Sequence, residues 1–479
     1  MASLKAAEEG AKVICIEKMT KGRGCFECFG AVGAKCQEGT EIDKVALLDE
    51  MYRSAYWRVR PEPIRTYVDR SGEATDFWQA ELDKGQNGFV ISKVEQAPST
   101  CGMPALTPLI DTELGFYDSP SLPPDAGVRS GYSGIYVCLE MQEVAKAYDN
   151  LDLRFSTPGV QLVRDGSGRV GGVIAKSGDE YVQINAGKGV ILATGDIGGN
   201  QEMVDAFCPI SNRSDSNCYA PAGFNNGDGL LMGMWAGAAM SKSEAAPMIH
   251  QFTLDTLEFN LTSFIMSWLA VNANGERYGA EMPFEPMLTN ARMNTPGNVA
   301  WSIFDSDYET YIMQQQPERY DRFTDGLDAV MEKWLGNGKL IKADTLDDLA
   351  KQLDIPADTF KATVERYNSM AEAGEDVDFD VPAQWLAPVK TAPFYATKNV
   401  CSTLTIPFGL HVNADSQVLT AEDEPIPGLF AIGNVQGDFF GKDYPVHCPG
   451  VSHGRCVTFG QLVGEACAKD TTIGELDFA

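Results

Sequence analysis

The first residues of the chain show two hydrophobic patterns that belong to one supersecondary unit. Residues 2–10 mix small and charged positions and stop at a glycine, which is typical of the second half of a helix. Val13–Ile16 is a short, apolar, β-branched run, which predicts a buried strand, and Glu17 follows it directly. Helix, glycine, strand and terminal acid are the closing parts of a dinucleotide-binding βαβ unit, whose acid takes a ribose hydroxyl. The opening strand and G-x-G-x-x-G turn are missing, so we expect the chain to begin inside the first helix of that unit.

The pattern then changes along the chain. Helical periodicity runs from about 43 to 82, and a Pro- and Gly-rich stretch at 96–133 predicts loops. From 151 onward, short strands at tight spacing predict a small antiparallel meander, and its last member, 189–195, is apolar enough for a buried parallel sheet. Mixed and mainly helical patterns fill about 200–395, after which strand and loop patterns return, and a closing helix is predicted after Gly450.

Signals of a nucleotide site therefore lie at both ends of the chain, with a different kind of sequence between them. We predict an α/β protein in which residues 1–205 and 396–479 form one Rossmann-like cofactor-binding domain, with 206–395 inserted as an α+β capping domain. The missing first strand would lie at the centre of a parallel sheet, where its loss leaves unpaired edges. We therefore expect a shortened chain rather than a variant fold.

Composition limits the class of partner. A chain of 479 residues suffices for two or three domains with sizeable cores. Its 38 Lys and Arg against 67 Asp and Glu give a formal charge of -29, which makes nucleic acid and anionic membranes poor partners. An acidic surface suits docking to a basic redox partner, but it is also common in proteins that are merely soluble. No sequence stretch has the length and apolarity of a membrane span, and no signal peptide is evident.

The 12 cysteines are scattered and do not resemble a disulfide framework. Cys25 and Cys28 make one C-x-x-C, but no second pair completes a zinc site. Phe29 in place of a histidine excludes covalent haem attachment at this pair. We expect no metal, and packing beside the cofactor rather than redox activity for these two cysteines.

Separated stretches along the chain form a specific set: EGAKVICIEK, GRGCFECFGA, GVILATGDIGGN, NNGDGLLMGMWAGA, VNANGERYGAE, ATVERYNSMAEAGEDVDF and EPIPGLFAIGN with TFGQLVGEA. Together they resemble the fumarate reductase and succinate dehydrogenase flavoprotein superfamily over nearly the whole chain. The last section is also similar to soluble anaerobic reductases and, more distantly, to 3-ketosteroid dehydrogenases. The resemblance implies non-covalently bound FAD, a smaller domain that caps the flavin, and hydride transfer to or from a carbon–carbon double bond.

The resemblance also implies a set of cofactor contacts. Glu17 would bind the adenosine ribose, Val160 would meet the adenine through its backbone, and Asp228 would hold the cofactor at a helix start. Asn434 stands where the family has an acid, and it keeps a side-chain acceptor. The start of the closing helix would face the pyrimidine edge of the flavin, where its dipole stabilises negative charge on the reduced cofactor. The remaining implied contacts are Lys18, Gly24, Cys25, Phe26, Gly30, Ala31, Ala193, Thr194, Gly195, Gly450, Ser452 and His453.

The residues that would carry the chemistry match the family less well. Fumarate reductases place an arginine four residues after the acid of their R-x-x-x-E motif. Here the motif is residues 277–281, and Glu285 stands at the position of that arginine. The family's later substrate arginine becomes His447, and a substrate histidine becomes Thr405. His250 keeps a family position with a shift of one residue.

Reduction of a double bond needs a proton donor for the carbon next to the one that receives hydride. Tyr444 and His447 precede the closing helix, and the Tyr-Pro pair resembles the one that ketosteroid dehydrogenases use beside their substrate carbonyl. Both can equally be structural, as a buried tyrosine and a loop histidine. Glu285 can be a buried acid with a raised pKa or a surface residue. We expect Arg277 to be structural.

We therefore expect an FAD-dependent ene-reductase that works anaerobically on an activated double bond of a small molecule other than fumarate. One alternative is the reverse reaction, in which a dehydrogenase desaturates a ketone such as a steroid. Another, of a different class, is a flavin-binding protein without turnover. Since no haem motif is present, the electrons would come from a separate donor protein. The protein would be soluble, and either cytoplasmic or exported.

Overall fold

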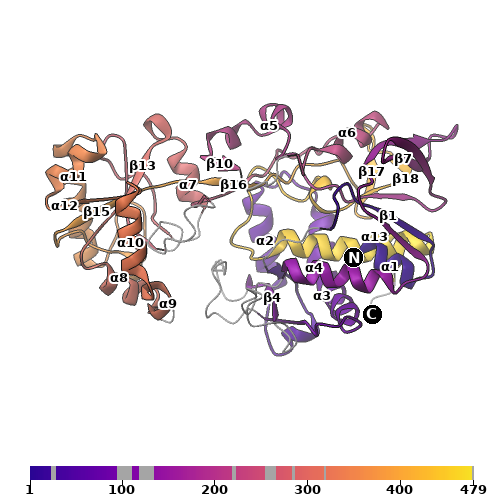
Figure 1. The fold of residues 1–479 in the computed structure, drawn as a ribbon, viewed down its shortest axis with the longest axis horizontal. Coiled ribbons are helices and arrows are strands. Elements are labelled where there is room, and N and C mark those ends of the chain that lie inside the picture. Colours follow the sequence, from indigo (N-terminus) through magenta and orange to yellow (C-terminus); the bar gives the residue numbers. More distant parts are fainter. Residues whose placement is uncertain are drawn as a thin grey trace. The chain divides into compact units, whose positions relative to one another are not determined.

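The chain forms two compact units (Figure 1). The structure, a computed structural model, describes residues 1–22, 28–93, 110–117, 134–217, 223–253, 266–282, 286–317 and 320–476. The first unit comprises Met1–Cys208, Pro221–Pro247 and Ile406–Ala479. The second comprises Pro209–Ala220 and Met248–Thr405.

These limits differ from the predicted domain limits, which fell after residues 205 and 395. Residues 221–247 belong to the first unit because they include helix α6 (Asp228–Trp235), which packs against strand β6 (Gly159–Arg164). Residues 396–405 belong to the second unit because their strands hydrogen-bond to its sheets. A sequence pattern shows where strands start, whereas the pairing of those strands decides which unit they join.

Two short sheets of the first unit contain parallel pairs between strands that lie far apart in the chain. Strand β1 (Val13–Ile16) pairs in parallel with β5 (Leu151–Arg154), and Glu17 directly follows β1, as predicted. Strand β9 (Val190–Leu192) pairs in parallel with β18 (Pro425–Ala431), which in turn pairs with β17 (Gln417–Leu419). The residues of β1 are only partly buried, because β5 is its sole strand partner within the described residues.

The antiparallel meander is smaller than predicted. It consists of β6, β7 (Val170–Ser177) and β8 (Glu180–Asn185). The prediction that β5 belongs to it is wrong, because that strand pairs with β1. A fourth sheet contains β2 (Phe29–Gly30), β4 (Glu113–Tyr117) and β3 (Val90–Lys93).

Helix α13 (Val451–Lys469) is the buried centre of the first unit. It packs against α1 (Ala2–Glu8) and α3 (Pro61–Leu82), and Figure 1 shows it in yellow beside the indigo α1. Its sequence alternates small residues with Val, Phe and Leu, so neighbouring backbones come close on several sides. The other helices of this unit are α2 (Lys44–Ser54), α4 (Gly134–Lys146) and α5 (Gln201–Phe207).

The second unit has its own core on a four-stranded antiparallel sheet with the order β12, β13, β15, β14. Leu269, Ile303 and Phe360 are fully buried in this core. Its sheet strands are β12 (Leu269–Asn272), β13 (Ala300–Asp305), β14 (Leu340–Ala343) and β15 (Phe394–Lys398). A smaller sheet joins β10 (Ser216–Asn217), β16 (Ser402–Thr405) and β11 (Met248–His250). The helices are α7 (Pro286–Arg292), α8 (Tyr308–Gln315), α9 (Tyr320–Thr324), α10 (Leu327–Gly336), α11 (Leu346–Leu353) and α12 (Ala357–Ala373).

Within the residues that the structure describes, none of the helices combines the length and apolarity that crossing a bilayer requires.

Candidate functional site

The start of α13 packs against β2 with almost no space between the two backbones. The Gly30 N–H donates to the Gly450 carbonyl at 2.8 Å. A Cβ at Gly454 would lie 1.9 Å from the Gly30 carbonyl oxygen. Gly450, which precedes the helix, has a φ of 71°, in the left-handed region that glycine adopts without strain. This contact fixes the direction of the first-turn N–H groups of α13, which are the anion-binding groups of a helix start.

This contact predicts a strong effect of one small substitution. Gly454→Ala places a methyl group against the Gly30 carbonyl and must separate α13 from β2. We expect the free energy of unfolding to be about 1–3 kcal/mol lower than in the wild type, and the flavin to be retained more weakly. Thermal unfolding and the absorbance of protein-bound flavin measure the two effects. Gly474→Ala is the matched control, because a Cβ there meets no atom within 4 Å. Equal stability of the two variants would contradict the conclusion that the close contact between α13 and β2 requires glycine at position 454.

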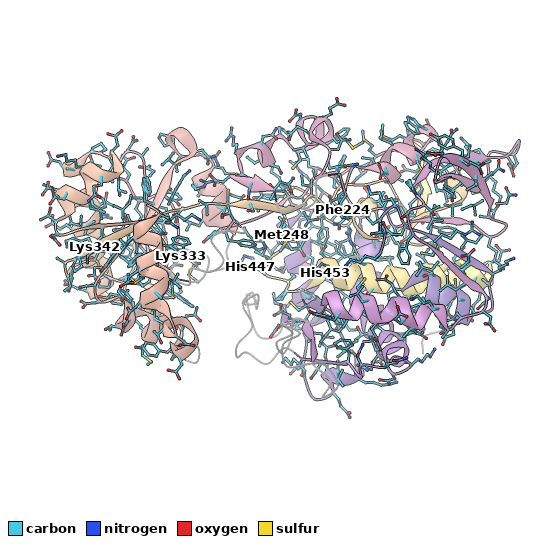
Figure 2. The ribbon with its side chains drawn as sticks, in the orientation of Figure 1. Phe224, Met248, Lys333, Lys342, His447 and His453 are labelled. Atoms are coloured by element: carbon cyan, nitrogen blue, oxygen red, sulfur yellow. The ribbon has the colours of Figure 1, made fainter. Side chains whose placement is uncertain are left out.

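Several predicted residues lie at or just before the beginning of α13. The buried Tyr444 hydroxyl accepts a hydrogen bond from the Ser452 N–H at 3.2 Å, and burial raises the pKa of Tyr444, so the phenol keeps its proton at neutral pH. His453 Nδ1 lies 2.9 Å from the Cys28 carbonyl oxygen, and since a carbonyl only accepts, this nitrogen carries a proton. His447 is partly exposed in the segment that leads to the helix; Figure 2 labels both histidines.

Another group of predicted residues lies where β1 ends and α6 begins. Lys18 Nζ pairs with Asp228 Oδ2 at 2.8 Å and also donates to the Gly223 carbonyl at 3.1 Å. The Glu17 carboxylate accepts the Met19 N–H at 2.8 Å. Val160 lies in β6 and follows Gly159. A Cβ at Gly159 would approach the Ile16 side chain of β1, so the two strands are close to each other here. The structure thus brings the predicted ribose and adenine contacts to one edge of the first unit.

The turn after β9, which contains the predicted Ala193, Thr194 and Gly195, packs tightly onto the start of α6. A Cβ at Gly229 would lie 2.1 Å from Thr194 Oγ1. This hydroxyl is buried and has no hydrogen-bond partner among the described residues. An unpaired buried hydroxyl costs about 1–3 kcal/mol, so Thr194 is a natural contact for a bound polar group.

Sequence reasoning missed two buried charges that connect these groups. Asp196 Oδ2 accepts from the Asn434 side-chain amide at 3.2 Å, and Oδ1 accepts from the Gly198 N–H at 2.9 Å. On its other side, Asn434 Oδ1 accepts from Arg455 Nη2 at 2.6 Å. The signal for Arg455 was available, because it is the one Lys, Arg, Asp or Glu residue in positions 451–464 of the closing helix.

The two other predicted catalytic residues in the described part of the chain lie in the second unit. His250 and Thr405 lie on neighbouring strands, β11 and β16, where Thr405 pairs with Met248. Burial lowers the pKa of His250 to about 4, which leaves a neutral imidazole at pH 7. Glu285 and the predicted cofactor contacts Gly24, Cys25 and Phe26 lie outside the described residues. The predicted contacts Gly30 and Ala31 are both buried at β2.

Arg277, the first residue of the R-x-x-x-E motif, is surrounded by its own partners in the second unit. Its guanidinium forms hydrogen bonds of 2.6 Å with both Glu281 and Asp376. It also lies between the rings of Tyr367 and Phe379, 5.0 and 4.9 Å from their centroids. Hydrogen bonds and charge from Arg277 outweigh burial and lower the pKa of Asp376 to about 2. These contacts are those of a structural residue.

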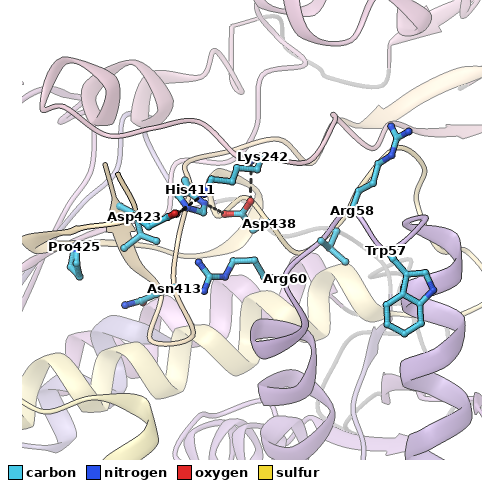
Figure 3. A pocket seen from close by; sticks show the side chains of 11 residues that line it. Trp57, Arg58, Arg60, Lys242, His411, Asn413, Asp423, Pro425 and Asp438 are labelled. Carbon is cyan, nitrogen blue, oxygen red and sulfur yellow. Dashed lines mark hydrogen bonds and ion pairs between the residues drawn. The ribbon is translucent and has the colours of Figure 1, made fainter. Parts of the chain in front are cut away.

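A pocket of about 510 Å³ in the first unit contains none of the predicted residues (Figure 3). His411 lies between two carboxylates there, with Nδ1 and Nε2 each 2.5 Å from Asp438 and Asp423 respectively. Lys242 pairs with Asp423 at 2.6 Å, and hydrogen bonds from Lys242 and His411 lower the pKa of Asp423 to about 2. Because these side chains are hydrogen-bond and ion-pair partners of one another, we assign the cluster a structural role, in which it holds the surrounding loops together.

A model of the family described as "FAD binding domain" matches residues 1–445. The chain is 32% identical over 334 residues to the 3-oxosteroid 1-dehydrogenase of Mycolicibacterium smegmatis, covering 62% of this chain and 55% of that protein. It is 28% identical over 344 residues to the probable fumarate reductase Ifc3 of Shewanella frigidimarina, covering 70% and 53%. The chain thus spans about half the length of these curated relatives.

A solved structure supports the fold alone. The 3-ketosteroid-delta4-(5alpha)-dehydrogenase from Rhodococcus jostii RHA1, in complex with 4-androstene-3,17-dione, superposes with a TM-score of 0.74 at 22% identity. The match covers 98% of this chain and 94% of that chain. The open conformation of a flavocytochrome c3 fumarate reductase matches with a TM-score of 0.65 at 23% identity, covering 98% and 76%.

The residues of the first unit fit FAD. The unpaired hydroxyl of Thr194 offers a hydrogen bond. The residue before α13 is Gly450, which has no side chain to cap the helix. The Ser452 N–H donates to Tyr444, and the other N–H groups of the first turn suit the electron-rich edge of a flavin. At the end of β1, the Glu17 carboxylate suits a ribose hydroxyl.

Proposed function

Since the chain belongs to the family of flavoproteins defined by this FAD binding domain, we propose that it is an oxidoreductase that reduces an activated carbon–carbon double bond. The predicted resemblance to fumarate reductases and ketosteroid dehydrogenases is confirmed, and FAD is the cofactor. Glu17, Thr194, Asn434 and Ser452 would hold FAD. When bound and reduced, FAD would supply hydride to one carbon of the substrate double bond.

The observation that carries the proposal is the buried phenol of Tyr444 at the start of α13. The Ser452 N–H donates to its oxygen, which helps to fix the ring, and the phenol keeps one O–H that it can donate. The raised pKa of Tyr444 means that the proton is present throughout the physiological range. A protonated group held beside the flavin-facing helix start is what the second carbon of the double bond requires.

The substrate is proposed to be neutral or singly charged, such as an enone, an acrylate-like acid or an aromatic compound. A dicarboxylate of fumarate size needs several cationic donors, because desolvating two unpaired carboxylates costs several kcal/mol. Arg277 is not available as such a donor, because Glu281 and Asp376 already occupy its guanidinium. His447 and Thr405 replace residues that bind the substrate in fumarate reductases.

A second candidate is the reverse reaction, desaturation of a ketone. It is favoured by the 32% identity to a 3-oxosteroid 1-dehydrogenase. In both reactions Tyr444 would act beside the substrate, so the direction of electron flow separates the candidates. As an ene-reductase, the protein would receive electrons from a separate donor protein.

The test uses the FAD-loaded protein without its natural donor. After chemical reduction under argon, it is mixed with an enone or with fumarate, and the return of oxidised flavin absorbance is followed. We expect the enone to reoxidise the flavin at least about 100-fold faster than fumarate, because fumarate would leave a buried carboxylate unpaired. Equal or faster reoxidation by fumarate would refute the proposed substrate class.

The same preparation distinguishes the alternatives. Bleaching of the oxidised flavin by a saturated ketone, without reoxidation by the enone, would replace the proposal with the dehydrogenase. Bound FAD that responds to neither compound would indicate a flavin-binding protein without turnover.

A further inference from the structure

Arg455 is a buried cation without a carboxylate partner among the described residues. Its side chain is fully buried and packs on the rings of Phe439 and Phe440, 5.2 and 4.7 Å from their centroids. Its hydrogen bonds go to Asn434 Oδ1 at 2.6 Å and, more weakly, to the Gln436 carbonyl at 3.4 Å. Its Nε is buried without a hydrogen-bond partner in the part of the chain that the structure describes. Arginines are almost never fully buried unless paired, so this one needs an explanation.

The nearest link to a negative charge runs through a neutral amide. Asn434 accepts from Arg455 with its oxygen and donates to Asp196 with its nitrogen, so it connects the two charges and keeps them apart. A carboxylate at position 434 would pair directly with Arg455 and cancel its charge. The amide instead satisfies one guanidinium N–H and leaves the positive charge uncancelled.

This charge lies on the cofactor helix. Arg455 follows Ser452 and His453 in α13, and Asn434 is itself a proposed FAD contact. Reduction of FAD by two electrons and one proton adds one negative charge to the cofactor. In a water-excluded site, a fixed cation stabilises such a charge far more than it would in water.

We infer that the positive charge of Arg455 favours the reduced form of bound FAD and raises the reduction potential of the cofactor. Arg455 is thus a positioning residue, and Asn434 and Asp196 determine how strongly its charge acts on the FAD. The inference rests on the proposed placement of FAD, and it does not depend on the substrate. The charge of Arg455 adds to the partial positive charge that every helix has at its N-terminus.

The test is a potentiometric titration of the FAD-loaded protein with mediator dyes. Arg455→Met is expected to reduce the preference for reduced over oxidised FAD by about tenfold, equivalent to about 30 mV for this two-electron couple. Arg455→Lys keeps the charge and should keep the preference within about threefold. Arg70→Met is the matched control, since Arg70 is also buried in the first unit but pairs with Glu73 at 2.7 Å. The reduction potential of FAD in this variant should equal that in the wild type.

Two further variants make the sign of the effect testable even if Arg455→Met does not fold. Asn434→Asp adds a negative charge and should lower the potential, whereas Asp196→Asn removes one and should raise it. Shifts of the same sign in these two variants would overturn the inference. So would unchanged potentials accompanied by lower unfolding temperatures, because they would assign Arg455 to structure alone. Shifts of the expected signs in a protein that reduces no enone would support this inference and contradict the proposed function.

Discussion

Replacing Tyr444 by phenylalanine is expected to lower the rate of double-bond reduction by a factor of about 10²–10⁴, the usual contribution of one positioned acid. The ring stays buried and only the hydroxyl is lost, so the packing of the segment before α13 is preserved. The effect should appear when pre-reduced protein is mixed with the enone, as slower return of oxidised flavin absorbance. FAD content and unfolding temperature should change little.

Tyr367→Phe is the matched control for this loss. Tyr367 is also a buried tyrosine whose hydroxyl accepts one backbone N–H, from Ala387 at 3.1 Å, but it lies in the core of the second unit. Its loss should leave the rate within about threefold, as expected for one neutral hydrogen bond. An equal rate for Tyr444→Phe and the wild type would contradict the role of Tyr444 and move the proton donor to His447 or Glu285.

Replacing Arg277 by methionine is expected to lower the free energy of unfolding of the second unit by about 3–5 kcal/mol, because Glu281 and Asp376 would be left buried without a cation. Chemical denaturation followed by tryptophan fluorescence, to which the buried Trp268 of the second unit contributes, measures this loss. Arg366→Met is the matched control, because Arg366 forms a similar pair with Asp378 at the surface, where solvent screening leaves such pairs little effect on stability. Equal effects of the two substitutions would contradict a structural role for the buried cluster.

The same cluster gives the second unit a defined response to acid. Arg277 lowers the pKa of Asp376 to about 2, below the ordinary value of an aspartate. A lowered pKa contributes stability that is present above about pH 4 and is lost as the pH falls toward 2. The unfolding free energy of the wild type should therefore fall over this range, and that of Arg277→Met should fall less.

The local elements of the cofactor unit could be read from the sequence because their signals are short-range. The apolar run before Glu17 predicted β1, and the glycines near residue 450 predicted where α13 begins. In each case the signal is a backbone requirement, burial of a short strand or a left-handed residue before a helix, which neighbouring residues in the chain express directly. The family resemblance was likewise carried by such turns.

Pairings between distant residues were decided only by the tertiary structure. Strand β5 was predicted in the meander but pairs with β1, because a short strand can satisfy its hydrogen bonds with any available edge. Asp376 completes the Arg277 cluster from 99 residues away. Asn434 lies between Asp196, 238 residues earlier in the chain, and Arg455 on the closing helix. Whether a buried charge is paired, cancelled or left to act on a cofactor depends on which side chains folding brings within hydrogen-bond distance, and spacing along the chain does not encode that distance.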